Sequence, residues 1–97
     1  MPYVQASDRS KVDSAISSLG YVLDGTPLDK RWGLLNYIIT QITGKALGAA
    51  YEANYNTFNS AIGALEAAKL ELYRRAIAPY EDRKIAENGD VPAYRDR

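Results

Sequence analysis

The stretch Thr57–Ala78, TFNSAIGALEAAKLELYRRAIA, decides the fold of this chain. Six of its residues recur at helical spacing: Phe58, Ile62, Leu65, Lys69, Leu72 and Ala76. Ala61, Ala64, Ala67 and Ala68 add small faces, and the only glycine in the stretch is Gly63. Most of the other residues are strong helix formers. The pattern predicts one helix over residues 57–78, roughly 33 Å long at about 1.5 Å per residue.

Both ends of this stretch carry boundary signals. The cluster Asn54-Tyr55-Asn56-Thr57 is typical of a turn followed by a helix cap. At the other end Pro79 lacks the N–H that a continuing helix needs, so we expect a kink or a new helix there. Residues 80–87 remain compatible with helix, and Asn88-Gly89 is a stop signal. Residues 90–97 are expected to form a tail.

A first helix is predicted to open at Ser7 or Asp8, because either side chain can accept a hydrogen bond from the free N–H groups of a first turn. Its apolar face follows spacings of four, three and four, at Val12, Ile16, Leu19 and Leu23. The run Asp24-Gly25-Thr26-Pro27 ends it, since the residue before a proline avoids the helical region.

A second helix is predicted to follow Pro27. Thr26 and Asp29 resemble a capping box with Asp in place of Glu. The expected buried side is Leu35, Ile38, Ile39 and Ile42. A strand over residues 34–42 is the alternative, but the strict alternation that a strand requires is missing. The sequence leaves the end of this helix open, with a continuation to about Glu52 allowed.

The predicted fold is therefore all-α, a small three-helix domain with a long, proline-interrupted C-terminal helix. We expect a single domain over residues 1–97, with flexible ends at about 1–6 and 90–97. Two shorter helices do not easily cover a helix of 33 Å, and a chain of 97 residues buries a limited core. Both points favour assembly as a homo-oligomer.

Composition excludes several classes of function. The chain has no Cys and no His, so disulfides, His/Cys zinc or haem sites and His-dependent nucleophile pairs are excluded. With 12 basic and 12 acidic residues it lacks the charge typical of sequence-specific nucleic-acid binding. No apolar run reaches the length of a membrane span. We expect no cofactor, no metal and no enzymatic activity.

The candidate ligand-binding residues gather around the end of the long helix. Arg74, Arg75 and Lys69 are suited to hold phosphate, and Tyr73 or Tyr80 is suited to stack on a base. Asn36 and Asn88 have side chains that can hydrogen-bond the edges of bases. A purely structural interpretation stays open. Glu71 and Arg75 then form an i,i+4 ion pair, Glu81-Asp82 pair with Arg83 and Lys84, and the tyrosines are edges of a small core.

Several segments resemble a family of short phage and prophage proteins of unknown function. The similar segments are Leu35-Asn36-Tyr37, Gly63-Ala64-Leu65-Glu66, Tyr73-Arg74-Arg75, Pro79-Tyr80-Glu81-Asp82 and Asn88-Gly89-Asp90. The resemblance implies phage origin and a helical fold. Because no targeting or membrane segment is visible, we expect the protein in the cytoplasm of the infected or lysogenic bacterial host. In size and in lack of catalytic groups the chain is also similar to the phage sponges that sequester cyclic nucleotide signals of CBASS or Thoeris immunity.

The leading functional prediction is a non-enzymatic homo-oligomer that sequesters a small anionic nucleotide, of the cyclic dinucleotide or cyclic ADP-ribose type, and so counters host defence. The alternative is an accessory phage protein that binds a protein partner and no small molecule. Eight tyrosines against one Phe and one Trp fit this alternative, because Tyr is enriched where one end of a ring is buried and the other is wet.

Overall fold

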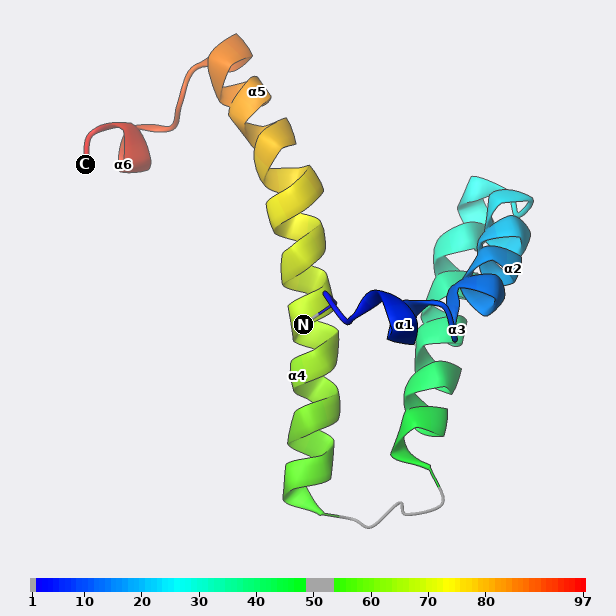
Figure 1. Cartoon of the computed structure of the whole chain (residues 1–97). Coiled ribbons are helices and arrows are strands. Elements are labelled where there is room, and N and C mark those ends of the chain that lie inside the picture. The colour runs from blue at the N-terminus through cyan, green and yellow to red at the C-terminus, as the bar shows by residue number, and fades with distance from the viewer. Residues whose placement is uncertain (1, 49–53) are drawn as a thin grey trace. The chain divides into compact units, whose positions relative to one another are not determined.

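The computed structural model describes residues 2–48 and 54–97, and in these residues the chain is all-α, with no strand (Figure 1). This confirms the predicted all-α class. The elements are α1 (Ala6–Arg9), α2 (Asp13–Asp24), α3 (Leu28–Leu47), α4 (Tyr55–Leu72), the π-helical segment η1 (Tyr73–Ile77), α5 (Ala78–Asn88) and α6 (Pro92–Arg95). The chain divides into two compact units, Met1–Ala61 and Ile62–Arg97.

The predicted first helix is interrupted. Its first turn, α1, is separated from α2 by a tighter turn in which the Val12 N–H donates to the Arg9 carbonyl at 3.0 Å. The Ser10 hydroxyl also bonds back, to the Ser7 carbonyl at 2.9 Å, and so competes with the helical ladder. The predicted cap is wrong as well, because Gln5 precedes α1 and makes no side-chain cap.

Helices α2 and α3 pack against each other as a hairpin. The Arg31 guanidinium fixes the turn by donating to the Thr26 carbonyl from Nε at 3.0 Å and to the Asp24 carbonyl from Nη2 at 3.0 Å. The predicted capping box does not form. The Thr26 hydroxyl instead donates to the Val22 carbonyl of α2 at 2.7 Å, and Pro27 is the residue that precedes α3.

The predicted buried side of α3 is correct in part. Leu35 and Ile38 are half-buried, as is the neighbouring Leu34, whereas Ile39 and Ile42 are exposed. The helix ends at Leu47, because Gly48 adopts a φ of 68° that leaves the helical region. The allowed continuation to Glu52 extends into residues 49–53, which lie outside the described residues.

The long helix begins where its cap signal predicts. The Asn54 Oδ1 atom accepts hydrogen bonds from the backbone N–H of Asn56 at 2.8 Å and of Thr57 at 3.3 Å. Two of the free donors of the first turn are thereby satisfied. From Tyr55 the chain stays helical for 34 residues, through α4, η1 and α5.

The helix continues past Pro79, but its regular α geometry is interrupted just before the proline. The turn before it widens to the π form, in which the Ala78 N–H donates to the Tyr73 carbonyl five residues earlier. A proline inside an α-helix removes one hydrogen bond and pushes its ring against the carbonyl four residues back, here that of Arg75. A π turn takes in one extra residue and relieves that clash. The sequence predicted the position of the disturbance but not its form.

The C-terminal end follows the predicted stop signal. Gly89 has a φ of 86°, and its N–H donates to the Ile85 carbonyl at 2.8 Å. Beyond it, where the sequence predicted only a tail, residues 92–95 form the single helical turn α6.

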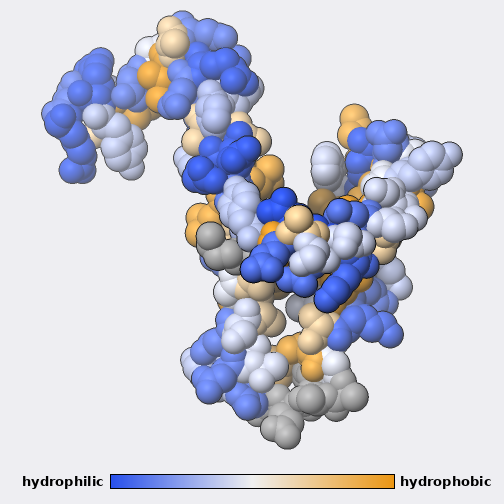
Figure 2. Space-filling model, viewed as in Figure 1, coloured by the Kyte–Doolittle hydropathy of each residue, from blue (hydrophilic) through white to orange (hydrophobic). Residues whose placement is uncertain are grey.

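Side chains on these helices remain accessible. None of the residues 2–48 and 54–97 is buried, and large apolar side chains are exposed in both units. Figure 2 shows such hydrophobic side chains at the surface. In the part of the chain that the structure describes, no helix combines the length and the hydropathy needed to cross a bilayer.

Candidate functional site

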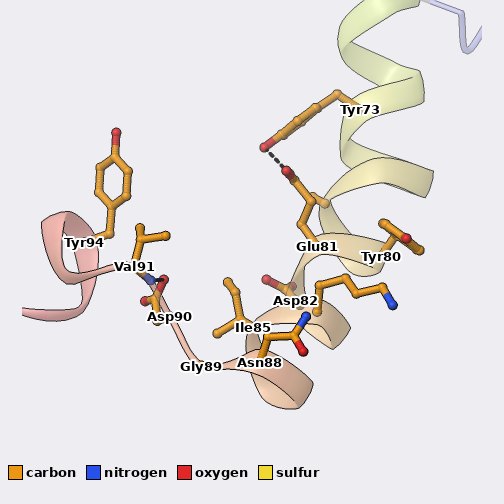
Figure 3. A pocket seen from close by; sticks show the side chains of 12 residues that line it. Tyr73, Tyr80, Glu81, Asp82, Ile85, Asn88, Gly89, Asp90, Val91 and Tyr94 are labelled. Carbon is orange, nitrogen blue, oxygen red and sulfur yellow. Dashed lines mark hydrogen bonds between the residues drawn. The ribbon is translucent and has the colours of Figure 1, made fainter.

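An open groove of about 650 Å³ lies within the C-terminal unit, between the end of the long helix and α6 (Figure 3). We call it the acidic groove. Its lining comes from one helix face and from the segment that follows Gly89. The lining residues are Tyr73, Ala78, Tyr80, Glu81, Asp82, Lys84, Ile85, Asn88, Gly89, Asp90, Val91 and Tyr94.

The best-defined contact in the acidic groove joins Tyr73 to Glu81. The Tyr73 hydroxyl donates to Glu81 Oε1 at 2.8 Å, across eight residues (Figure 3). Eight residues of a regular helix exceed two turns, so these side chains align only because η1 takes in one extra residue. The hydrogen bond and the charge of Glu81 raise the pKa of Tyr73, and the charge of Asp82 adds to the effect.

The groove carries a surplus of negative charge. Glu81, Asp82 and Asp90 contribute three carboxylates against the single ammonium group of Lys84. That ammonium group is engaged elsewhere: it lies 3.2 Å from Glu87 and 5.6 Å from the centre of the Tyr80 ring. The predicted pairing of Glu81-Asp82 with Arg83 and Lys84 is absent from the described ion pairs, because Lys84 turns to Glu87 one turn later.

The predicted phosphate-binding cations lie outside the groove. Lys69 pairs with Glu66 at 3.0 Å, and Arg74 pairs with Glu71 at 2.7 Å, each over three residues of helix. The expected Glu71–Arg75 pair is therefore replaced by Glu71–Arg74. Arg75 forms no ion pair or hydrogen bond with the described residues.

Of the seven predicted ligand-binding residues, the acidic groove brings together Tyr73, Tyr80 and Asn88. Asn36 lies on α3 in the other unit and accepts a hydrogen bond from the Thr40 hydroxyl at 3.3 Å. Sequence reasoning missed Asp90, Val91 and Tyr94, which it had assigned to a tail. The signal that could have found them is Gly89, which the sequence analysis used only as a helix stop; its φ of 86° turns the chain out of α5, and the residues after it line the groove.

Among the described residues, no group of three or more Asp or Glu side chains is placed so that it could hold a metal ion. The acidic groove instead offers apolar and aromatic surface bordered by carboxylates. Such a lining suits a cationic or apolar side chain better than an anion, because like charges repel.

Residues 1–91 match a protein family described as a domain of unknown function (DUF6899). The chain belongs to the DUF6899 family. Its membership covers all of the described helices except α6, which lies beyond residue 91. No curated protein and no solved structure matches the DUF6899 chain.

Proposed function

We propose that this DUF6899 chain is a non-enzymatic protein that acts through protein–protein contacts, with copies of itself and with a protein partner. One observation carries the proposal: no residue in the described part of the chain is buried, while large apolar and tyrosine side chains are exposed. In the C-terminal unit these include Leu70, Leu72, Tyr73, Tyr80 and Tyr94.

A single helix has no interior, so the C-terminal unit has few neighbours of its own against which to pack its apolar side chains. Burial of apolar surface is the main favourable term in folding and in protein association. Exposed apolar patches rimmed by charge mark interaction sites, and tyrosine is enriched at them. A homo-oligomer buries this surface between copies, and a partner protein buries what remains.

As part of this proposal, the resemblance to short phage proteins supports an accessory role inside the bacterial host. The acidic groove supports protein contact over small-molecule capture. Its three carboxylates disfavour an anionic nucleotide, whereas a protein segment with basic and apolar side chains complements them.

Sequestration of an anionic cyclic nucleotide is the second candidate function. Arg75 favours it, because its guanidinium is not engaged by the described residues and lies one residue from the exposed Arg74. In this candidate Arg74, Arg75 and Lys69 contact phosphate outside the groove, Tyr73 or Tyr80 stacks on a base, and Asn36 and Asn88 contact base edges. The ligand then requires a surface that the acidic groove does not provide.

Two measurements on the purified chain separate the candidates. Light scattering at micromolar concentration is expected to give at least the mass of a dimer, twice 10.7 kDa. A thermal-shift panel of cyclic dinucleotides, cyclic trinucleotides and cyclic ADP-ribose variants is expected to leave the melting temperature unchanged. A monomer that is stabilised by one of these nucleotides would overturn the proposal in favour of the second candidate.

A further inference from the structure

The π-helical turn aligns two opposite charges on one face of the long helix. The Tyr73–Glu81 hydrogen bond establishes that side chains eight residues apart across η1 point the same way. Arg74 and Asp82 have the same spacing, one residue further along, so they share the adjacent face. Ala78 lies midway between them on the same face. We call this row the Arg74–Asp82 face.

The charges of the Arg74–Asp82 face complement those of an identical helix that runs in the opposite direction. A positive charge lies four residues before Ala78 and a negative charge four residues after it. Further out, Leu70 lies four residues before Arg74, and Ile85 lies three residues after Asp82. Both apolar side chains are exposed, at 54% and 43%. A second helix laid antiparallel over Ala78 therefore places opposite charges, and then apolar side chains, against each other.

The charges on this face have room for such a partner. Asp82 makes no hydrogen bond or ion pair within the described residues and lines the acidic groove. Arg74 is held by Glu71, but 63% of its side chain is exposed, so its fork can reach a further carboxylate. Ala78 has only a methyl group to separate two helices at their crossing.

We propose that a second copy of this chain docks antiparallel across Ala78, with Arg74 of each copy paired to Asp82 of the other. The arrangement is a two-fold interface, in which every contact occurs twice. It rests on the proposed protein-contact function and names its first partner and surface. A parallel arrangement in register would set Arg74 against Arg74 and Asp82 against Asp82.

Charge reversal tests the interface. Arg74→Asp alone faces Asp82 of an identical copy, and Asp82→Arg alone faces Arg74, so each variant is expected to self-associate roughly ten- to a hundredfold more weakly. An equimolar mixture of the two variants restores both pairs in a mixed dimer. Sedimentation or light scattering on each variant and on the mixture is expected to show loss and then recovery of the dimer mass.

Arg75→Asp is the matched control, because it introduces the same charge change one residue away, off the Arg74–Asp82 face. It is expected to keep the wild-type mass. Circular dichroism of every variant checks that the helix content is retained. The interface is overturned if the mixture stays monomeric, or if Arg75→Asp dissociates the dimer as strongly as Arg74→Asp. If the wild type is a dimer and Arg74→Asp keeps the same dimer mass, the proposed register is wrong, but the protein-contact function is not contradicted.

Discussion

The Tyr73 hydroxyl donates a hydrogen bond to the Glu81 carboxylate, and the contribution of this bond to stability depends on pH. The contact raises the pKa of Tyr73 above its ordinary value of about 10. The folded chain thus holds this proton more tightly than the unfolded chain does. Its contribution to stability is complete below the unfolded pKa and is lost as the pH rises through the raised, folded pKa.

Replacing the charge tests this linkage. Glu81→Gln is expected to lower the pKa of Tyr73, because the neutral amide removes the negative charge that opposes a phenolate. Absorbance titration of the tyrosines in the variant and in Tyr73→Phe identifies the signal. Glu87→Gln is the control, since Glu87 pairs with Lys84 and not with Tyr73. An unchanged titration of Tyr73 in Glu81→Gln would contradict the contact.

The two neighbouring arginines distinguish a phosphate site from a structural one. If the chain holds a nucleotide, Arg74→Ala or Arg75→Ala is expected to weaken its affinity by roughly 1.5–3 kcal/mol, as for a charge-assisted hydrogen bond. Folding should change by less than about 1 kcal/mol, because 63% of the Arg74 side chain is exposed, although Glu71 is half-buried. Arg75→Lys should not restore the full affinity, since Lys lacks the planar fork.

Calorimetric titration and thermal melting of the same variants measure both quantities. Unchanged affinity in a chain that does bind nucleotide would remove these residues from the site. A loss of melting temperature without a specific loss of ligand would indicate a structural role instead.

At this scale two local signals were predictable, whereas the contact across the π turn was not. The Asn54 cap and the Gly89 stop follow from local chemistry that the residue types determine. The Tyr73–Glu81 bond depends on the helical phase, which the widened turn alters. Glu71 can pair with Arg74 three residues on or with Arg75 four residues on, and the residue types do not decide between the two; the structure pairs it with Arg74.

At the scale of elements, Pro79 explains why a π segment stands inside the long helix. In Pro79→Ala the new N–H can donate to the Arg75 carbonyl, so a regular α-helix can run through. We expect a higher melting temperature, with a gain below about 3 kcal/mol because the π turn already accommodates part of the strain. Tyr73 should then face away from Glu81, and the pKa of Tyr73 should fall toward its ordinary value.

Circular dichroism melts and tyrosine titration report the two effects together. Pro92→Ala is the control, because Pro92 occupies the first position of α6, where proline is tolerated. It should give no comparable gain. If Pro79→Ala changes neither the melt nor the titration, something other than the proline holds the π turn open.

Element boundaries show where local signals compete. The existence of α2, α3 and the long helix follows from periodicity. The break after α1 does not follow from periodicity. The Ser10 hydroxyl can donate a hydrogen bond either to the backbone or to solvent, and the sequence does not decide between the two. Thr26 is a similar case, since its hydroxyl serves α2 and not the capping box of α3.

At the scale of the whole molecule, the expected small core has no counterpart among the described residues, none of which is buried. The apolar periodicity of the long helix was visible in the sequence, but periodicity does not say whether a face is covered by the same chain or by another. The acidic groove was likewise only half predictable. Its helical side lies on the predicted cluster, whereas Asp90, Val91 and Tyr94 depend on the turn at Gly89.

A chain that covers its apolar faces with another copy has a stability that depends on concentration. Because assembly binds the folded state and not the unfolded one, dilution removes stabilisation by mass action. A hundredfold increase in protein concentration is expected to stabilise a folded dimer by roughly 2.7 kcal/mol, and so to raise the melting temperature measurably. Circular dichroism melts over that range, on the wild type and on Arg74→Asp, provide the measurement. The variant should melt lower and converge on the wild type at low concentration, where both are monomers. A wild-type melting temperature that stays constant over the hundredfold range would show that the helices are stable as single chains, and that their exposed apolar faces need no second copy.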